Sequence, residues 1–157
     1  MNHGNSSETV GGWGVWPVAY SPVTFRPEAL RGADGARSAT IDYQLTRRHL
    51  LAELKRGRLG RVDVCDAHTE LLRAAANVGE LTEVDCPVCE EQKLINVSYV
   101  FGGRLPSFGR CITKPSELTA FNRQQGEYAC YVVEICVGCR WNHLLRVFRL
   151  GRGVASA

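Results

Sequence analysis

The sequence predicts an α+β domain in which two helices precede an antiparallel sheet, and three observations support this prediction. Amphipathic helical segments come first, and β-branched and aromatic runs follow them. Two CxxC pairs, Cys86–Cys89 and Cys136–Cys139, lie within these runs, with 46 residues between them. Strands that enter and leave a CxxC turn form a knuckle, and two knuckles facing one metal ion form a zinc ribbon. We therefore expect a zinc-ribbon-like sheet with an inserted helix, since a minimal four-cysteine module needs only roughly 15–20 intervening residues.

The chain has 157 residues, of which 45% are hydrophobic, and this is enough for one domain with a core. Residues 1–39 contain nine glycines or prolines without a helical or strand period, which predicts a disordered tail. The single domain is expected over 40–151, followed by a frayed C-terminus over 152–157. Neither a signal peptide nor an apolar run of about 20 residues is visible. An odd number of cysteines, seven, fits metal ligands and free thiols in the cytoplasm.

Order is expected to begin near Thr40 with two helices. The first helix has four apolar side chains on one face, at Tyr43, Leu50, Leu51 and Leu54. Gly57 and Gly60 are expected to end it. The second helix is expected to start at Asp66 as its N-cap and to stop at Gly79. Its buried side is predicted to carry Leu71, Leu72 and Ala75.

Four runs of β-branched and aromatic residues predict the strands that enter and leave the two knuckles, at 83–85, 93–101, 128–135 and 141–150. Between them, Pro115 is typical of the first turn of a helix. Leu118 and Phe121 are expected on the inward side of this inserted helix, and Gly126 is expected to stop it.

The four CxxC cysteines are the predicted ligands of one structural zinc ion: Cys86, Cys89, Cys136 and Cys139. An iron–sulfur cluster and redox dithiols are the alternatives, although a thioredoxin-type CxxC starts a helix and these pairs are flanked by strands. His143 lies four residues after Cys139 and is a candidate to replace a cysteine or to support a ligand from outside the coordination shell. A plain structural role for His143 is favoured. Cys65, Cys111 and Cys130 are interpreted as buried free thiols, with a spare-ligand role left open for Cys130.

The net charge of +3 conceals a strong segregation of charge along the chain. Residues 40–62 carry a net charge of +4, residues 63–91 carry −7 and residues 92–157 carry +6. A surface polarised in this way is suited to docking on a charged partner or on nucleic acid, although a solvated helix face gives the same pattern.

No catalytic site is recognisable in the sequence. It contains no Gly-rich phosphate loop and no nucleophile in a familiar context, and four thiolates leave a zinc ion no open position for a substrate. The expected function is therefore a non-enzymatic accessory protein, without a small-molecule substrate, that docks on RNA polymerase or the ribosome. This expectation rests on the recurrence of zinc ribbons in transcription and translation proteins.

Two other functions stay open at this point. One is a redox or zinc sensor whose zinc leaves on thiol oxidation. The other is direct binding of single-stranded nucleic acid by arginines interleaved with aromatic residues. The candidate contacts for that second function are Arg104, Arg110, Arg123, Arg140, Arg146, Arg149 and Trp141.

Several short stretches between residues 40 and 151 together resemble a family of small uncharacterised actinobacterial proteins, classed as a domain of unknown function. These stretches are Asp42-Tyr43 with Arg47-Arg48, Val64-Cys65-Asp66-Ala67 with Leu71-Leu72-Arg73-Ala74-Ala75, Cys86-Pro-Val-Cys89, Val100-Phe101-Gly102, Val132-Val133-Glu134-Ile135-Cys136 and Cys139-Arg140-Trp141-Asn142-His143-Leu144. The resemblance implies a shared fold and no established activity.

Overall fold

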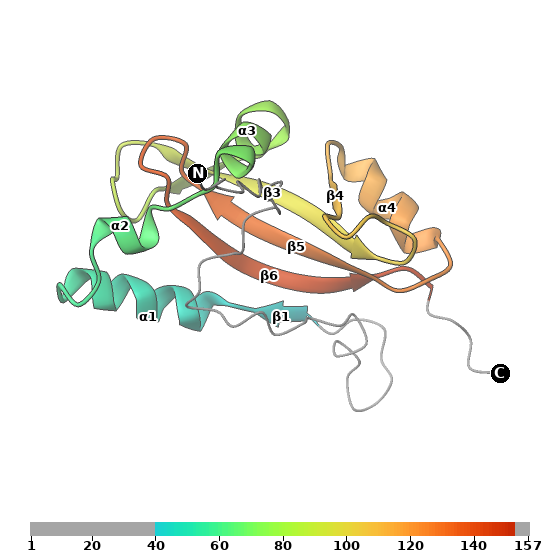
Figure 1. Ribbon diagram of the computed structural model, residues 1–157, viewed down its shortest axis with the longest axis horizontal. Helices are drawn as coiled ribbons and strands as arrows, with labels where there is room; N and C mark the ends of the chain where they lie inside the picture. The colour runs from blue at the N-terminus through green and yellow to red at the C-terminus, as the bar shows by residue number, and fades with distance from the viewer. Residues whose placement is uncertain (1–39, 153–157) are drawn as a thin grey trace, which may run out of the picture.

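The computed structural model describes residues 40–152, so the predicted disordered tail over 1–39 and residues 153–157 lie outside the described part of the chain (Figure 1). The elements follow the order β1 (Thr40–Asp42), α1 (Gln44–Lys55), α2 (Arg61–Val64), α3 (Thr69–Val78), β2 (Glu80–Asp85), β3 (Lys93–Gly102), β4 (Arg110–Cys111), α4 (Pro115–Arg123), β5 (Tyr128–Ile135) and β6 (Asn142–Leu150). The strands form one six-stranded antiparallel sheet of order β1-β6-β5-β3-β2, in which β4 also pairs with β3. The predicted α+β class is confirmed.

The pairing of β3 with β5 places the two CxxC turns at the same end of the sheet. The chain leaves the first turn along β3 and enters the second along β5, and these strands are antiparallel neighbours. Ile95, near the start of β3, is the partner of Ile135, the last residue of β5. The two hairpins therefore present their turns side by side, as a zinc-ribbon-like arrangement requires.

Helix α3 packs on the sheet through Leu71 and Ala75, which join a buried cluster with Val97, Val133 and Ile135. The alternate residues of the same strands pack elsewhere, because successive side chains of a strand point to opposite faces. These residues, including Val100 and Val132, surround Phe121 of the inserted helix α4. Figure 1 shows α4 at the end of the sheet away from the two CxxC turns.

Helix α1 has no fully buried residue, but its apolar side reaches the CxxC end of the molecule. Leu51 and Leu54 pack against a cluster that contains Leu94 and the fully buried Trp141. Leu51 and Leu54 of the predicted apolar face therefore lie against the CxxC end of the sheet, whereas Tyr43 packs against Ala129 and Val147.

The predicted start of the second helix is wrong. The helix begins later than expected, with His68 as its N-cap, and the side chain of His68 accepts a hydrogen bond from the backbone N–H of Glu70. Asp66, the expected N-cap, instead accepts a hydrogen bond from the side chain of Asn142. Leu71 and Ala75 are buried as predicted, and the partly buried Leu72 packs against the same cluster.

Three short elements were not predicted from the sequence. Strand β1 has three residues and pairs with β6, α2 is a four-residue helix, and β4 has two residues. Elements this short contain too few residues to express a period. Arg152, expected in the frayed C-terminus, forms two backbone hydrogen bonds. Its N–H donates to the carbonyl of Gln124, and its carbonyl accepts from the N–H of Gly126.

Replacing Gly79 by alanine is expected to destabilise the domain by about 1–3 kcal/mol, because overpacking displaces neighbouring atoms. A Cβ atom at this position would lie 2.2 Å from Cγ2 of Ile95 and 2.6 Å from the backbone oxygen of Ala75. Urea denaturation measures the effect, with Gly60→Ala as the control because the nearest atom to its Cβ would be Oδ2 at the end of the Asp63 side chain, at 3.3 Å. Equal stability of the two variants would contradict the close contact between α3 and β3.

Candidate metal centre

The two CxxC turns have the same backbone construction. The N–H of Cys86 donates to the carbonyl of Gln92, and the N–H of Cys136 donates to the carbonyl of Trp141, both at 2.8 Å. The residue after each pair turns back to the carbonyl of the first cysteine, from Glu90 at 3.0 Å and from Arg140 at 2.9 Å. Glu90 and Arg140 are also the two non-glycine residues with positive φ in the described chain, at 58° and 70°. The two knuckles are therefore structurally equivalent.

The four cysteine sulfurs of the knuckles form one compact group, and all lie within 4.8 Å of one another. The Sγ atoms of Cys86 and Cys139 are 3.5 Å apart, and those of Cys89 and Cys136 are 3.7 Å apart. A tetrahedral zinc ion with Zn–S bonds of about 2.3 Å separates its sulfurs by about 3.8 Å. The sulfurs therefore have the number, the chemistry and the spacing that a metal ion with four thiolate ligands needs.

Burial opposes the ionisation of these thiols in the absence of a cation. Burial raises the pKa of Cys86 and of Cys139 above the usual value for a thiol. Burial also acts against ionisation of Cys89, but the backbone N–H of Glu91 and the neighbouring thiols lower its pKa overall. A bound divalent cation would be the largest local charge and would hold all four sulfurs as thiolates.

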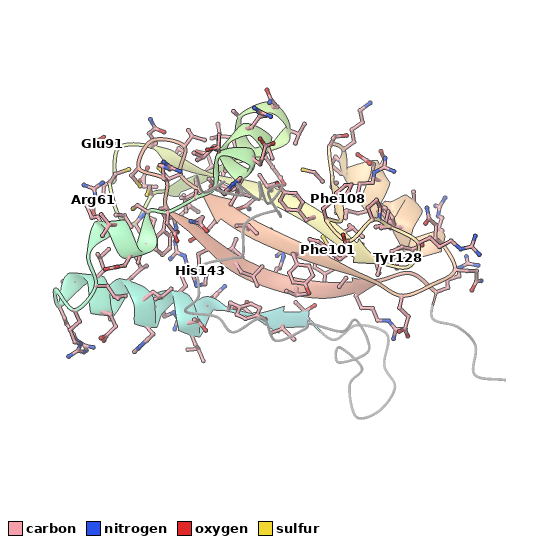
Figure 2. The ribbon with its side chains drawn as sticks, in the orientation of Figure 1. Arg61, Glu91, Phe101, Phe108, Tyr128 and His143 are labelled. Carbon is pink, nitrogen blue, oxygen red and sulfur yellow. The ribbon has the colours of Figure 1, made fainter. Side chains whose placement is uncertain are left out.

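A fifth sulfur lies beside this group, and its position there was not predicted from the sequence. Cys65 is a free thiol, as interpreted, but it is only partly buried, and its Sγ is 3.8 Å from Cys139 Sγ. Burial raises the pKa of Cys65, while hydrogen bonds with Cys139 and with the guanidinium of Arg61 act in the opposite direction. Arg61, on α2, lies at the same end of the molecule as Glu91 of the first knuckle (Figure 2).

The other two cysteines lie apart from the sulfur group. Cys130 is fully buried in the cluster around Phe121, as its interpretation as a small hydrophobic residue predicts, and it is not a spare ligand. Cys111 is partly buried beside Tyr99 in the cluster under α3.

A buried carboxylate lies beneath α1, next to the CxxC end of the sheet. Oε1 of Glu134 accepts hydrogen bonds from Nε of Arg47 at 2.6 Å and from Nε1 of Trp141 at 2.9 Å. Glu134 is 4% exposed, so its charge depends on these two donors. This arrangement attaches α1 to the sheet.

His143 is buried and faces the same carboxylate. It is the cross-strand partner of Glu134, and its ring stacks on Trp141 with centroids 5.9 Å apart and planes at 10°. Neither ring nitrogen has a hydrogen-bond partner in the described part of the chain. His143 therefore forms no hydrogen bond that would support a cysteine ligand there. Burial lowers the pKa of His143, Glu134 acts to raise it and Arg47 to lower it.

The stability of the domain is expected to fall as the pH drops below about 6.5, because the unfolded chain then binds a proton that the buried His143 resists. The slope contributed by one such histidine approaches about 1.4 kcal/mol per pH unit. His143→Phe keeps a ring against Trp141 and removes the titration. Urea midpoints of the metal-loaded proteins between pH 7.5 and about 5 should fall more steeply for the natural chain than for the variant. Parallel curves would contradict a neutral buried His143.

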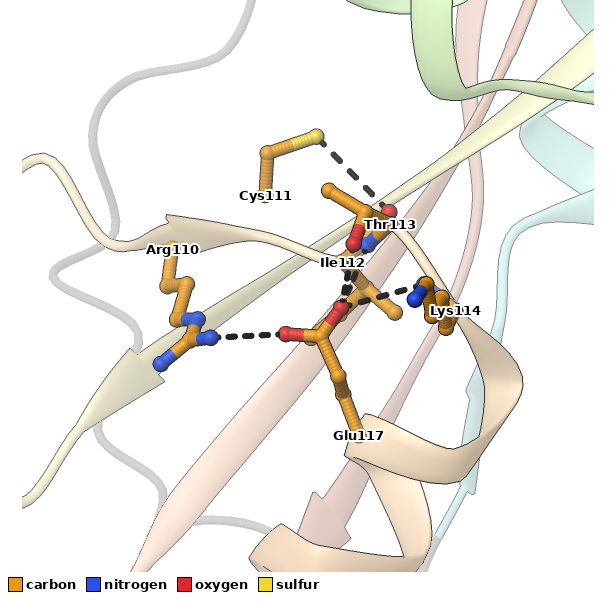
Figure 3. Close-up of polar contacts among 6 residues, drawn as sticks. All are labelled: Arg110, Cys111, Ile112, Thr113, Lys114 and Glu117. Carbon is orange, nitrogen blue, oxygen red and sulfur yellow. Dashed lines mark hydrogen bonds and ion pairs between the residues drawn. The ribbon is translucent and has the colours of Figure 1, made fainter.

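The candidate nucleic-acid contacts do not form one stacking surface. Trp141 is 0% exposed and donates to Glu134, so its proposed role in stacking on a base is wrong. Arg110 pairs with Glu117 at 2.9 Å (Figure 3), and Arg140 donates twice to the carbonyl of Ala67. Arg149 pairs with Glu127. The remaining candidates are exposed on three separate elements or loops, at Arg104, Arg123 and Arg146.

Comparison with known proteins identifies the family. A family model described as a family of unknown function, DUF5318, matches residues 35–157. The chain belongs to this family. It is 43% identical over 111 residues to an uncharacterised protein of Mycobacterium tuberculosis (Rv0049) and to one of Mycobacterium bovis (Mb0050). Each alignment covers 71% of this chain and 81% of the relative. The DUF5318 assignment confirms the resemblance to uncharacterised actinobacterial proteins.

No solved structure matches this DUF5318 chain. Among residues 40–152, no helix has both the length and the apolar character needed to cross a membrane.

Proposed function

We propose that this DUF5318 protein is a non-enzymatic, zinc-stabilised accessory module that docks on a larger cytoplasmic assembly. The observation that carries the proposal is the group of four cysteine sulfurs in two equivalent knuckles. Four thiolates complete the tetrahedral shell of a structural zinc ion and leave no position for a substrate or an activated water. The residues that would hold the ion are Cys86, Cys89, Cys136 and Cys139.

The work of the metal in this proposal is to join the two hairpins. Each hairpin contributes one CxxC pair, and the buried Trp141 and Leu94 lie in the same cluster as the cysteines. Structural zinc supplies on the order of 10–16 kcal/mol in small modules, which matches or exceeds the stability of a typical domain. Folding and zinc binding would then be one equilibrium.

RNA polymerase and the ribosome are the proposed partners. The support for them is associational, since zinc ribbons recur in transcription and translation proteins and a fold does not fix a function. The surface supports docking in a general way, because β2 and the first knuckle carry exposed acidic residues that form no ion pair within residues 40–152, at Glu80, Glu83, Glu90 and Glu91. An acidic surface favours a basic protein partner over the phosphate backbone of a nucleic acid.

Affinity purification of the tagged protein from its native cell, with and without nuclease, tests this function. Recovery of RNA polymerase or ribosomal subunits that persists after nuclease treatment is the expected result. Recovery that disappears with nuclease and weakens steeply with salt would instead favour direct nucleic-acid binding. Recovery of neither machine under either condition would contradict the proposed partners.

Thiol-based redox or zinc sensing is a second candidate, and the fifth sulfur beside Cys139 favours it. After a hydroperoxide has oxidised one of two neighbouring thiols to a sulfenic acid, the other thiol can condense with it to form a disulfide bond. Release of zinc by mild peroxide from a chain that keeps its sheet would support sensing. Zinc that stays bound until the whole domain unfolds would exclude it.

A further inference from the structure

We infer that Cys65 is a reserve metal ligand that takes the coordination position of Cys139. The inference rests on the proposed metal site. The 3.8 Å between the Sγ atoms of Cys65 and Cys139 equals the separation expected for two thiolates on one zinc ion. It is also close to the 3.5 Å and 3.7 Å observed within the knuckle group itself. The site therefore contains five sulfurs for four tetrahedral positions.

The segment that carries Cys65 is fastened to the second knuckle. The N–H of Ala67 donates to the carbonyl of Arg140 at 3.0 Å, and the guanidinium of Arg140 donates back to the carbonyl of Ala67 at 2.6 Å. The side chain of Asn142 donates to Asp66 at 2.9 Å. Because Arg140 and Asn142 closely follow Cys139, these bonds hold the sulfur of Cys65 at a defined place beside that ligand.

Only the position of Cys139 is within reach of the reserve sulfur. Cys65 does not belong to the group of sulfurs that all lie within 4.8 Å of one another, and its close sulfur contact is with Cys139. Cys139 is partly exposed, whereas Cys86 and Cys136 are fully buried. A ligand at the partly exposed position can move outward without opening the core.

The exchange balances without an oxidant or another reagent. The bond from the metal to Cys139 Sγ breaks, a bond to Cys65 Sγ forms, and the thiol proton of Cys65 passes to the departing Cys139. The metal keeps four thiolates throughout, and one of them becomes exchangeable.

Cobalt binding by serine variants tests this assignment, because thiolate-to-cobalt charge-transfer absorption reports the number of sulfur ligands. Cys139→Ser should keep one metal ion with an undiminished charge-transfer band. The double variant Cys65→Ser/Cys139→Ser should bind zinc about 100-fold more weakly than Cys139→Ser, since loss of even an outer partner of a ligand costs 10–100-fold. Cys89→Ser is the matched control, because the fifth sulfur of the described chain lies beside Cys139 and not beside Cys89, and this variant should lose affinity whether or not Cys65 is present.

A second experiment compares the natural protein with Cys65→Ser, both of which keep all four knuckle cysteines. Zinc release to a chelator from Cys65→Ser should be about tenfold slower than from the natural protein, because the incoming ligand is missing and each tenfold is about 1.4 kcal/mol of barrier. This experiment decides the question if Cys139→Ser does not fold. An unchanged release rate, or equal loss of metal in Cys139→Ser and Cys89→Ser, would overturn the reserve ligand alone. A natural protein that binds no metal would overturn the proposed function as well.

Discussion

Replacing Cys136 by serine is expected to abolish metal binding and to unfold the knuckle end of the domain. Cys136 is fully buried, its Sγ is 3.7 Å from that of Cys89, and its own N–H closes the second knuckle on Trp141. The substitution leaves three thiolates for the metal and places a hydroxyl in a buried apolar cluster. Since the binding energy of structural zinc is folding energy, the loss is on the order of the whole stability of the domain.

Circular dichroism and elemental analysis of the purified variant measure this effect. Cys130→Ser is the matched control, because Cys130 lies on β5, the strand that leads into Cys136, and is equally buried but belongs to the cluster around Phe121. The control should keep its metal and lose only about 1–3 kcal/mol for a buried hydroxyl without a partner. Metal retained by Cys136→Ser, or lost by Cys130→Ser, would mean that the ligand set is assigned wrongly.

Replacing Arg47 by methionine is expected to destabilise the domain by about 3–5 kcal/mol, because it leaves a buried carboxylate without its counter-ion. Glu134 is 4% exposed, and its remaining donor is the indole N–H of Trp141. Arg48→Met is the control, because Arg48 is an exposed neighbour on the same helix, and it should change the stability by only about 0.5 kcal/mol.

The double variant Arg47→Met/Glu134→Gln separates loss of the ion pair from loss of packing. The glutamine still offers an oxygen to Trp141 but carries no charge, so most of the lost stability should return. Urea denaturation of the natural chain, the two single variants and the double variant gives the free energies of unfolding to be compared. A double variant no more stable than Arg47→Met alone would contradict the claim that the unpaired charge causes the loss.

The regular part of the fold follows from local sequence patterns. The runs at 128–135 and 93–101 predict β5 and nearly all of β3, because β-branched and aromatic residues alternate over enough positions to express the period of a strand. The helix expected after Pro115 is α4, because proline is typical of the first turn of a helix. The CxxC spacing identifies the four sulfurs that the structure brings together, because the geometry of a knuckle is local.

The contacts that the sequence did not reveal join residues far apart in the chain. Arg47 and Glu134 are separated by 87 positions, and Cys65 and Cys139 by 74. No local period encodes such pairs. Trp141 was misassigned for a related reason. An aromatic residue beside arginines in the sequence suggested a base-stacking surface, whereas Trp141 is buried and its indole N–H donates to the carboxylate of Glu134.

Elemental analysis of the purified chain, combined with its absorption spectrum, tests whether the four cysteines hold a structural zinc ion. We expect one zinc ion per chain and no visible absorbance, with zinc lost from Cys136→Ser and kept by Cys130→Ser. Iron together with a visible absorption band would show that the four cysteines hold an iron–sulfur cluster instead of zinc. A fully folded natural chain without any metal would contradict the claim that the four cysteines hold a structural ion.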